Sequence, residues 1–327
     1  MRILTNTTKI RNLLSKYVEV DYVETRRLKE LIEVGRNGDY DIIYFARYVP
    51  PLIDTVRIPE LRSKVIIGMH LPIMIEHVNR PHHVIHNVLM PMQVRMYLRN
   101  RGVIIHVLNR DDEKYLMRHD YGRVIYAPLA TNTELFKPGD KSSTFTLVYS
   151  SRASWQKGTD LAVRAMKALA ERLRDKIRII IIAYGPLVKL YSSLNGLSNV
   201  SVISYQPLND FVKILSQSHA LLFTSRYESF ALLPLDALSA GNLVVSFNVR
   251  GFIRDYMLND SKLGRFIVDF GDVNELISRV MELINLWYSN ENEYLNLINY
   301  ARSFAEGFST NIIARIYLNL FTQVLSS

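Results

Sequence analysis

The chain has 327 residues, of which 48% are hydrophobic and 22% charged, a composition that indicates a soluble globular protein long enough for two domains. It contains no cysteine, which excludes disulfides, thiolate catalysis and Cys-based zinc sites and is consistent with a cytoplasmic protein. No run approaches the about 18 apolar residues of a spanning helix. Lys9, Arg11 and Lys16 interrupt any signal-peptide pattern. The net charge of +9 indicates an anionic partner, such as a diphosphate group, an acidic membrane surface or nucleic acid.

Strand-like and helix-like segments alternate through nearly the whole chain, which predicts βα units and parallel sheets. A polar stretch with Pro and Gly at 137–143 marks the expected boundary between domains 1–138 and 139–309. The strands expected after this boundary are apolar on both faces, as buried parallel strands are. The expected strands are 2–5, 18–23, 41–45, 64–69, 103–108, 123–127, 145–150, 177–183, 200–203, 220–224, 243–247 and 266–268. The expected helices are 159–173, 208–216, 234–240, 273–288 and 310–325.

The stretch 78–109 contains no acidic residue, and its four arginines, Arg80, Arg95, Arg99 and Arg101, alternate with apolar residues. One interpretation is an amphipathic surface, within 80–101, that makes peripheral contact with an anionic membrane. The other is a helix that packs on its own domain and exposes a solvated basic face.

Four histidines, His77, His82, His83 and His86, lie close together in the sequence. His82 and His86 are four positions apart and could share one helix face, which is the spacing of a zinc ligand pair. The chain has no cysteine to complete such a site, and the nearest carboxylate, Glu76, lies six positions before His82. Solvated or ligand-facing histidines are therefore favoured, and no metal is expected.

A short loop after the expected strand 145–150 carries two cations, Arg152 and Lys157, and ends at Gly158. Ligands of open parallel sheets bind at the carboxyl ends of the strands. A guanidinium can bind two oxygens at once, an ammonium adds a point charge, and the helix that follows presents its N-terminus. This pattern is typical of a diphosphate site. The alternative is a surface Arg and Lys at a helix start.

Two carboxylates lie eight positions apart, Glu228 in a loop after the expected strand 220–224 and Asp236 inside the next helix. The backbone N–H groups at this helix start are expected to be free for phosphate oxygens or sugar hydroxyls. The alternative for Glu228 is a charge favoured by the helix dipole. His70 ends the expected strand 64–69, either as a site residue or as a structural strand cap. The backbone donors are expected at Ser229, Phe230, Ala231, Leu232 and Leu233.

Five short segments follow one another in order from residue 131 onward. They are Thr131-Asn132-Thr133-Glu134-Leu135-Phe136-Lys137-Pro138, Ser151-Arg152 with Lys157-Gly158, Ala183-Tyr184-Gly185-Pro186, Glu228 with Asp236 and the following Ala237-Leu238-Ser239-Ala240-Gly241, and Arg250-Gly251. In this order and spacing they resemble family 4 of the glycosyltransferases. The resemblance implies the GT-B fold, an α/β architecture of two Rossmann-like domains facing each other across a cleft. The helix at 310–327 is then expected to pack back on the first domain.

The resemblance also implies a reaction: retaining, metal-independent transfer of a sugar from a nucleotide sugar, without a cofactor. UDP- or GDP-sugars are the favoured donors, and the acceptor is a carbohydrate, lipid or protein. By resemblance Arg152 and Lys157 stabilise the leaving diphosphate, Glu228 contacts the donor sugar and Asp236 the ribose. The remaining expected site residues are His70 beside the developing charge, Gly185 in the turn, and Tyr205 and Gln206 at the base.

The chain departs from the family pattern at several positions, and two other functions stay open. Asp236 replaces the usual Glu, and Ser229 and Ala231 replace glycines, although both residues are small. The opening loop 6–9 contains no glycine, which excludes a dinucleotide fingerprint there and departs from the family. The alternatives are a sugar phosphorylase on the same fold and a non-enzymatic protein that binds nucleotide sugars or, less favoured, nucleic acid.

Overall fold

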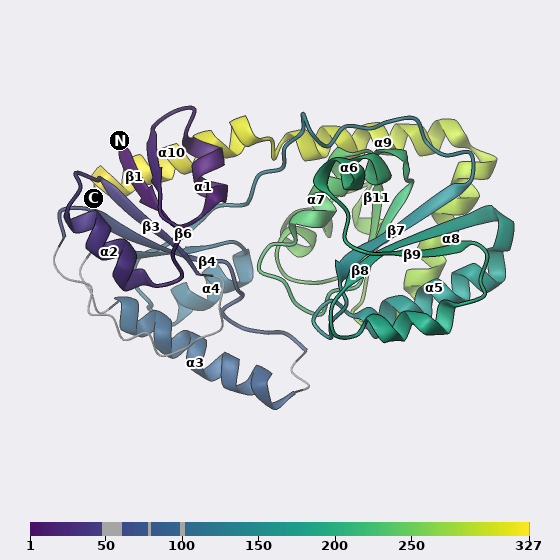
Figure 1. Cartoon of the computed structure of the whole chain (residues 1–327), viewed down its shortest axis with the longest axis horizontal. Helices are drawn as coiled ribbons and strands as arrows, with labels where there is room; N and C mark the ends of the chain where they lie inside the picture. The colour runs from purple at the N-terminus through teal and green to yellow at the C-terminus, as the bar shows by residue number, and fades with distance from the viewer. Residues whose placement is uncertain (48–60, 78–79, 99–101, 327) are drawn as a thin grey trace. The chain divides into compact units, whose positions relative to one another are not determined.

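The structure is a computed structural model that describes residues 1–47, 61–77, 80–98 and 102–326. The chain divides into two compact units, which are described separately (Figure 1). The first unit comprises Met1–Ala130, Glu228–Phe230 and Thr310–Ser327, and the second comprises Thr131–Tyr227 and Ala231–Ser309. Each unit is built on one six-stranded parallel sheet, as the alternating pattern predicts.

The sheet of the first unit has the strand order β2-β1-β3-β4-β5-β6. Its central strands are buried on both faces because helices cover them, and their residues are mostly Ile, Val and Phe. The strands are β1 (Arg2–Thr5), β2 (Glu19–Tyr22), β3 (Ile42–Arg47), β4 (Lys64–Met69), β5 (Val103–Val107) and β6 (Val124–Tyr126). The helices are α1 (Thr8–Leu14), α2 (Leu28–Arg36), α3 (Pro81–Leu98), α4 (Arg110–Arg118) and α10 (Thr310–Ser326).

The C-terminal helix α10 belongs to the first unit although it is the last element of the chain (Figure 1). The buried stripe consists of Ile313, Tyr317 and Phe321, each at most 1% exposed, whereas Ile312 and Ile316, which the apolar spacing also assigns to it, are exposed. The hydroxyl of Tyr17 donates to Asn311 Oδ1 at 3.0 Å, which adds a polar contact at the start of the helix. The surface that this stripe requires is therefore supplied by the N-terminal part of the chain.

The sheet of the second unit has the order β12-β11-β10-β7-β8-β9. Three expectations need correction. Strand β7 continues through Ser151 and Arg152, which were expected in a loop, because it pairs with β8 over its whole length. Helix α7 begins at Leu232, two residues earlier than expected, and helix α9 was not anticipated. The strands are β7 (Phe145–Arg152), β8 (Ile177–Tyr184), β9 (Val200–Ile203), β10 (Ala220–Phe223), β11 (Leu243–Phe247) and β12 (Ile267–Val268). The α-helices are α5 (Thr159–Leu173), α6 (Leu208–Gln217), α7 (Leu232–Ser239), α8 (Val273–Ser289) and α9 (Glu291–Glu306).

Each sheet has one point where the chain changes direction across the sheet. In the first unit β1 lies between β2 and β3, and in the second unit β7 lies between β8 and β10. In open parallel sheets, ligands bind outside the carboxyl ends of the two strands that flank such a point. The loops that follow β7 and β10 are therefore the first place to look for a site in the second unit.

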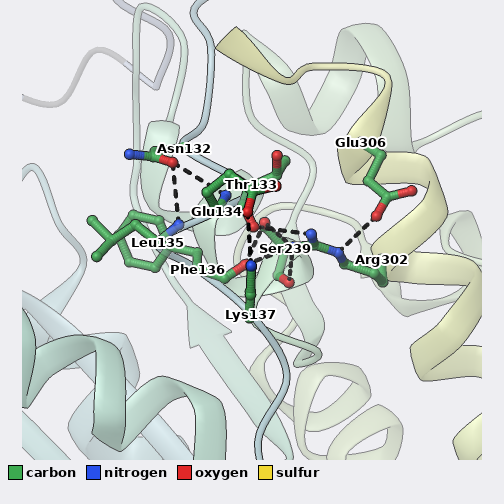
Figure 2. Close-up of polar contacts among 9 residues, drawn as sticks. All are labelled: Asn132, Thr133, Glu134, Leu135, Phe136, Lys137, Ser239, Arg302 and Glu306. Atoms are coloured by element: carbon green, nitrogen blue, oxygen red, sulfur yellow. Dashed lines mark hydrogen bonds and ion pairs between the residues drawn. The ribbon is translucent and has the colours of Figure 1, made fainter. Parts of the chain in front are cut away.

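Arg302 of α9 connects three segments of the second unit (Figure 2). Its guanidinium donates to the carbonyl oxygens of Thr133, Phe136 and Ser239 at 2.9, 2.6 and 2.8 Å, and its Nε pairs with Glu306 at 3.0 Å. The segment that enters this unit is thereby fastened to the ends of α7 and α9.

Candidate active site

The end of β7 brings Arg152 against Gly185. Arg152 is the exposed last residue of the strand and lies opposite Tyr184 of β8. Gly185 follows Tyr184 with φ of 115°, and a Cβ built there would lie 3.0 Å from Arg152 Cγ and 3.1 Å from the carbonyl oxygen of Ala153. Glycine at 185 therefore allows the turn to approach the Arg152 side chain closely. These two residues, both expected in the site, are adjacent.

Lys157 lies immediately before helix α5, on a backbone fixed by neighbours. Its carbonyl oxygen accepts from the hydroxyls of Thr224, at 2.9 Å, and Tyr149, at 3.2 Å. Gly158 is the N-cap of α5 with φ of 65°, and a Cβ there would lie 2.0 Å from the Thr224 carbonyl oxygen. The N–H groups at the start of α5 and the Lys157 side chain thus belong to one segment, which is a favourable place for an anion.

Two exposed tyrosines lie at the carboxyl ends of β8 and β9. Tyr205 is 70% exposed and Tyr184 is 52% exposed. Their rings meet edge to face with 6.1 Å between the centroids. The expected base residues Tyr205 and Gln206 are therefore accompanied by Tyr184, to which the sequence pattern assigned no role. Its place as the last residue of an apolar strand was the signal that could have identified it.

Helix α7 positions Asp236 in its second turn, where Oδ1 accepts from the hydroxyl of Thr131 at 2.6 Å. Leu232 and Leu233 form the first turn, as the corrected helix start places them. Ala231, the N-cap, has φ of 71° and ψ of 72°. The expectation that a small side chain suffices at this position is incomplete, because the left-handed backbone strains any residue with a Cβ.

Glu228, Ser229 and Phe230 belong to the first unit, together with His70. The Ser229 hydroxyl donates to the carbonyl oxygen of His70 at 2.9 Å. Glu228 is buried, 9% exposed, and the ring of Phe230 is also buried. Ser229 and Phe230 precede α7, so their N–H groups are loop donors and not part of the helix start as expected.

His70 follows β4 and is buried. Its Nε2 lies 3.4 Å from the hydroxyl oxygen of Tyr44. Burial, with smaller contributions from Lys9 and His106, lowers the pKa of His70 well below its usual value. Tyr44 also hydrogen-bonds His106 Nδ1 at 2.6 Å, and burial lowers the pKa of His106 to about 4. Both rings are therefore neutral at pH 7, and His70 can offer a hydrogen bond but no positive charge.

The histidines near α3 have structural contacts. His86 is buried and its Nε2 lies 2.8 Å from the carbonyl oxygen of Pro72, while the rings of His82 and His83 meet at 4.3 Å. In the part of the chain that the structure describes, no three His, Cys, Asp or Glu residues are grouped closely enough to bind a metal ion. No helix among the described residues is long and apolar enough to span a bilayer.

Sequence reasoning also missed Arg226, a buried residue in the loop after β10. Its guanidinium pairs with Asp160 of α5 at 2.8 Å and lies 3.6 Å from the ring centre of Trp155. Nothing local in the sequence links these residues, because 66 positions separate Arg226 from Asp160. The pair joins the two loops at the β7–β10 switch point.

The fold and these loops define a Rossmann-like α/β protein in which Arg152, Lys157 and the start of α5 lie at a strand switch point. Comparison with known proteins agrees: the family described as Glycosyl transferases group 1 matches residues 131–304, so the chain belongs to this family. The predicted membership of the family 4 glycosyltransferases and the GT-B fold are confirmed.

Two curated relatives and one solved structure illustrate the similarity. The chain is 29% identical over 136 residues to a phosphatidylinositol N-acetylglucosaminyltransferase subunit of Arabidopsis thaliana, covering 39% of this chain and 30% of the relative. It is 25% identical over 177 residues to an N,N'-diacetylbacillosaminyl-diphospho-undecaprenol alpha-1,3-N-acetylgalactosaminyltransferase of Campylobacter jejuni. This match covers 54% of this chain and 44% of the relative. The chain thus matches less than half the length of either relative. The structure of a variant of S. aureus TarM with UDP superposes with a TM-score of 0.67 at 17% identity, over 85% of this chain and 55% of TarM.

Proposed function

We propose that this chain is a retaining, metal-independent glycosyltransferase that moves a sugar from a nucleotide sugar to an acceptor. The observation that carries the proposal is the β7–β10 switch point, where Arg152 ends β7 and Lys157 precedes the N-terminus of α5. Cleavage of a sugar–phosphate bond adds negative charge to the leaving diphosphate. Fixed cations and backbone donors stabilise that charge in the transition state.

The other site residues take roles that fit their surroundings. We propose that Glu228 and the main-chain N–H groups of Ser229 and Phe230 bind the donor sugar. Asp236 binds the ribose. In that role Asp236 keeps its bond from the Thr131 hydroxyl on Oδ1. The exposed pair Tyr184 and Tyr205 offers aromatic faces to the base.

UDP is the nucleotide that we expect, because the similar TarM structure contains UDP. The acceptor that we propose is a lipid-linked headgroup, because both curated relatives carry lipid acceptors in their names. In the first unit, a cavity of about 810 Å³ at the β1–β3 switch point is of a suitable size for such a headgroup. Arg26, Arg27 and Arg47 line it together with Glu24 and Glu30. Asn6, also in the lining, is held by bonds to the main chain of Ala46 at 2.7 and 3.1 Å.

Helix α3 supports peripheral contact with an anionic membrane. Val84, Ile85, Val88 and Met92 are all exposed and fall on one side of the helix, and Arg95 is exposed beside them. An apolar stripe with an adjacent cation and no acidic residue fits the surface of an anionic bilayer. Arg99 and Arg101, which the sequence also assigns to this surface, lie outside the described residues. Co-sedimentation with vesicles of phosphatidylcholine and phosphatidylglycerol tests this contact: Val88→Asp should abolish it and Leu208→Asp, on α6, should not. Binding that is equally strong to pure phosphatidylcholine would contradict it.

A metal-free thermal-shift screen against UDP, GDP, ADP and their sugar conjugates tests the donor half of the proposal. A ligand that binds only the folded protein raises its melting temperature by mass action. We expect a shift with UDP that is lost in Lys157→Ala and kept in Lys167→Ala, a control on the exposed side of α5. Turnover of the identified donor should fall strongly in Glu228→Gln.

The phosphorylase alternative makes a different prediction with the same protein. A rate that requires inorganic phosphate and no nucleotide would replace our proposal with that function. A folded protein that shifts with none of the nucleotides would refute the donor assignment.

A further inference from the structure

Two loops of the second unit, 153–158 after β7 and 224–227 after β10, are joined by a dense set of contacts. The main-chain N–H of Arg226 donates to the carbonyl of Gln156 at 2.7 Å, and the Gln156 side chain donates back to the carbonyl of Tyr227 at 3.3 Å. The Thr224 hydroxyl donates to the carbonyl of Lys157 at 2.9 Å. The main chain that carries Lys157 is therefore fastened to the segment that leads directly into Glu228.

The Arg226 side chain makes the strongest of these contacts. It is 5% exposed, and its two terminal nitrogens donate to the two carboxylate oxygens of Asp160, both at 2.8 Å. Nη1 also donates to the carbonyl of Trp155 at 2.8 Å, and the guanidinium lies 3.6 Å from the centre of the Trp155 ring. A forked ion pair with a stacked face fixes the orientation of both groups, which a lysine at this position would not do.

Stability is a weak reason for this arrangement. Burying the Arg226 charge beside a partly exposed carboxylate costs about as much as their attraction returns, and well-packed apolar residues often serve equally well. The position of Asp160 suggests another reason, because it lies in the first turn of α5, at the helix end next to Lys157. An unpaired carboxylate there would repel a bound diphosphate. Although burial opposes ionisation, Arg226 lowers the pKa of Asp160, so the carboxylate stays ionised and paired.

We infer that Arg226 and Asp160 are a positioning pair: they orient the Lys157 loop for the donor diphosphate and cancel the carboxylate charge beside it. The inference rests on the proposed function and adds two residues to it, neither of which touches the donor. Preorganised cations stabilise developing charge without reorganisation during the reaction. Loosening the pair should therefore raise the KM for the donor and lower kcat.

The test compares variants in donor turnover and in UDP titration. In Arg226→Met with Asp160→Leu, both charges are replaced by apolar groups, so we expect a folded protein with at least tenfold weaker UDP binding and about a hundredfold lower kcat/KM. Arg226→Met alone leaves the carboxylate unpaired and should raise the donor KM more than the double variant does. A purely structural role predicts no such difference. Lys167→Met with Glu171→Leu, an exposed pair on the same helix at 3.9 Å, is the control and should stay within twofold of wild type.

Arg226→Lys keeps the positive charge but cannot donate to both carboxylate oxygens of Asp160 from two planar nitrogens. It provides a second test if the double variant does not fold. We expect it to fold and to recover part of the lost kcat/KM. The inference is overturned if a folded double variant, or Arg226→Lys in its place, binds UDP and turns over within twofold of wild type. A wild-type protein that binds no nucleotide would instead overturn the proposed function, so the two failures are distinguishable.

Discussion

Replacement of Arg302 by Met is the most informative test of how the second unit is held together. The methylene stem is kept, while the guanidinium and its bonds to the carbonyls of Thr133, Phe136 and Ser239 are lost (Figure 2). The carbonyl of Phe136 retains the Ser239 hydroxyl at 2.8 Å as a donor. The carbonyl of Ser239 is at the end of α7, in a residue that is fully buried, and it is the group most affected.

The magnitude follows from these three carbonyls. A buried carbonyl deprived of its donor costs about 1–3 kcal/mol, and each partly compensated bond about 0.5–1.5 kcal/mol. We therefore expect the free energy of unfolding to fall by about 3 kcal/mol. Since 1 kcal/mol shifts the melting temperature of a domain of roughly 150–250 residues by about 2–4 °C, the transition should fall by roughly 6–12 °C.

Urea unfolding and calorimetry provide the assay, and Arg279 provides the matched control. Arg279 pairs with Glu275 at 2.7 Å and Glu282 at 3.0 Å, but within α8 itself and with all three side chains partly exposed. Such pairs contribute about 0–1 kcal/mol, so Arg279→Met should change stability little. Equal losses in the two variants, or a loss below about 0.5 kcal/mol in Arg302→Met, would refute the reasoning.

Three further perturbations have defined outcomes. Gly158→Ala places a Cβ 2.0 Å from the Thr224 carbonyl oxygen, at a residue with positive φ. The free energy of unfolding, measured by urea titration, should fall by about 2–5 kcal/mol. A loss below about 1 kcal/mol would contradict the close approach. Ala231→Gly removes left-handed strain of about 1–2 kcal/mol against an entropic cost of about 0.5–1 kcal/mol, so its melting temperature should rise slightly, and a fall would count against the strained N-cap. The third perturbation is a change of pH. Burial lowers the folded-state pKa of His106 to about 4 and that of His219 to about 3. As the pH falls below about 6.5, these histidines therefore bind protons in the unfolded chain before they do so in the folded protein. Each histidine should therefore remove about 2 kcal/mol of stability between pH 7 and pH 5, and unfolding titrations of His106→Gln at both pH values should show a weaker dependence than wild type; an unchanged dependence would refute the assignment.

The periodic elements were predictable because their signals are local. Strands β1, β4, β9 and β11 and helix α5 have the bounds read from the sequence. Buried parallel strands are short apolar runs between turn residues, and α5 has an amphipathic pattern that begins after a glycine. Helix α9 was missed because polar residues dominate its first turns.

The positions of several candidate site residues were predictable because they also depend on local sequence signals. Arg152 ends β7, Lys157 lies in the loop after it and Gly185 follows β8, so the ends of those strands locate all three residues. Arg226 gave no such signal, because its partner Asp160 reaches it only through the pairing of β10 with β7. The pKa of His70 depends likewise on burial that residues distant in sequence create.

The sequence by itself determined the two parallel sheets, their approximate strands and the family, because hydrophobic periodicity and the spacing of motif residues are properties of contiguous segments. Only the tertiary structure decided that Ala231 has a left-handed backbone, that Asp236 is bonded to Thr131, and that Arg226 joins the loops around Lys157. These features depend on segments brought together by sheet order and packing. Hydrogen bonds and burial between such segments cannot be read from local pattern, because the partners are fixed only when the sheet forms.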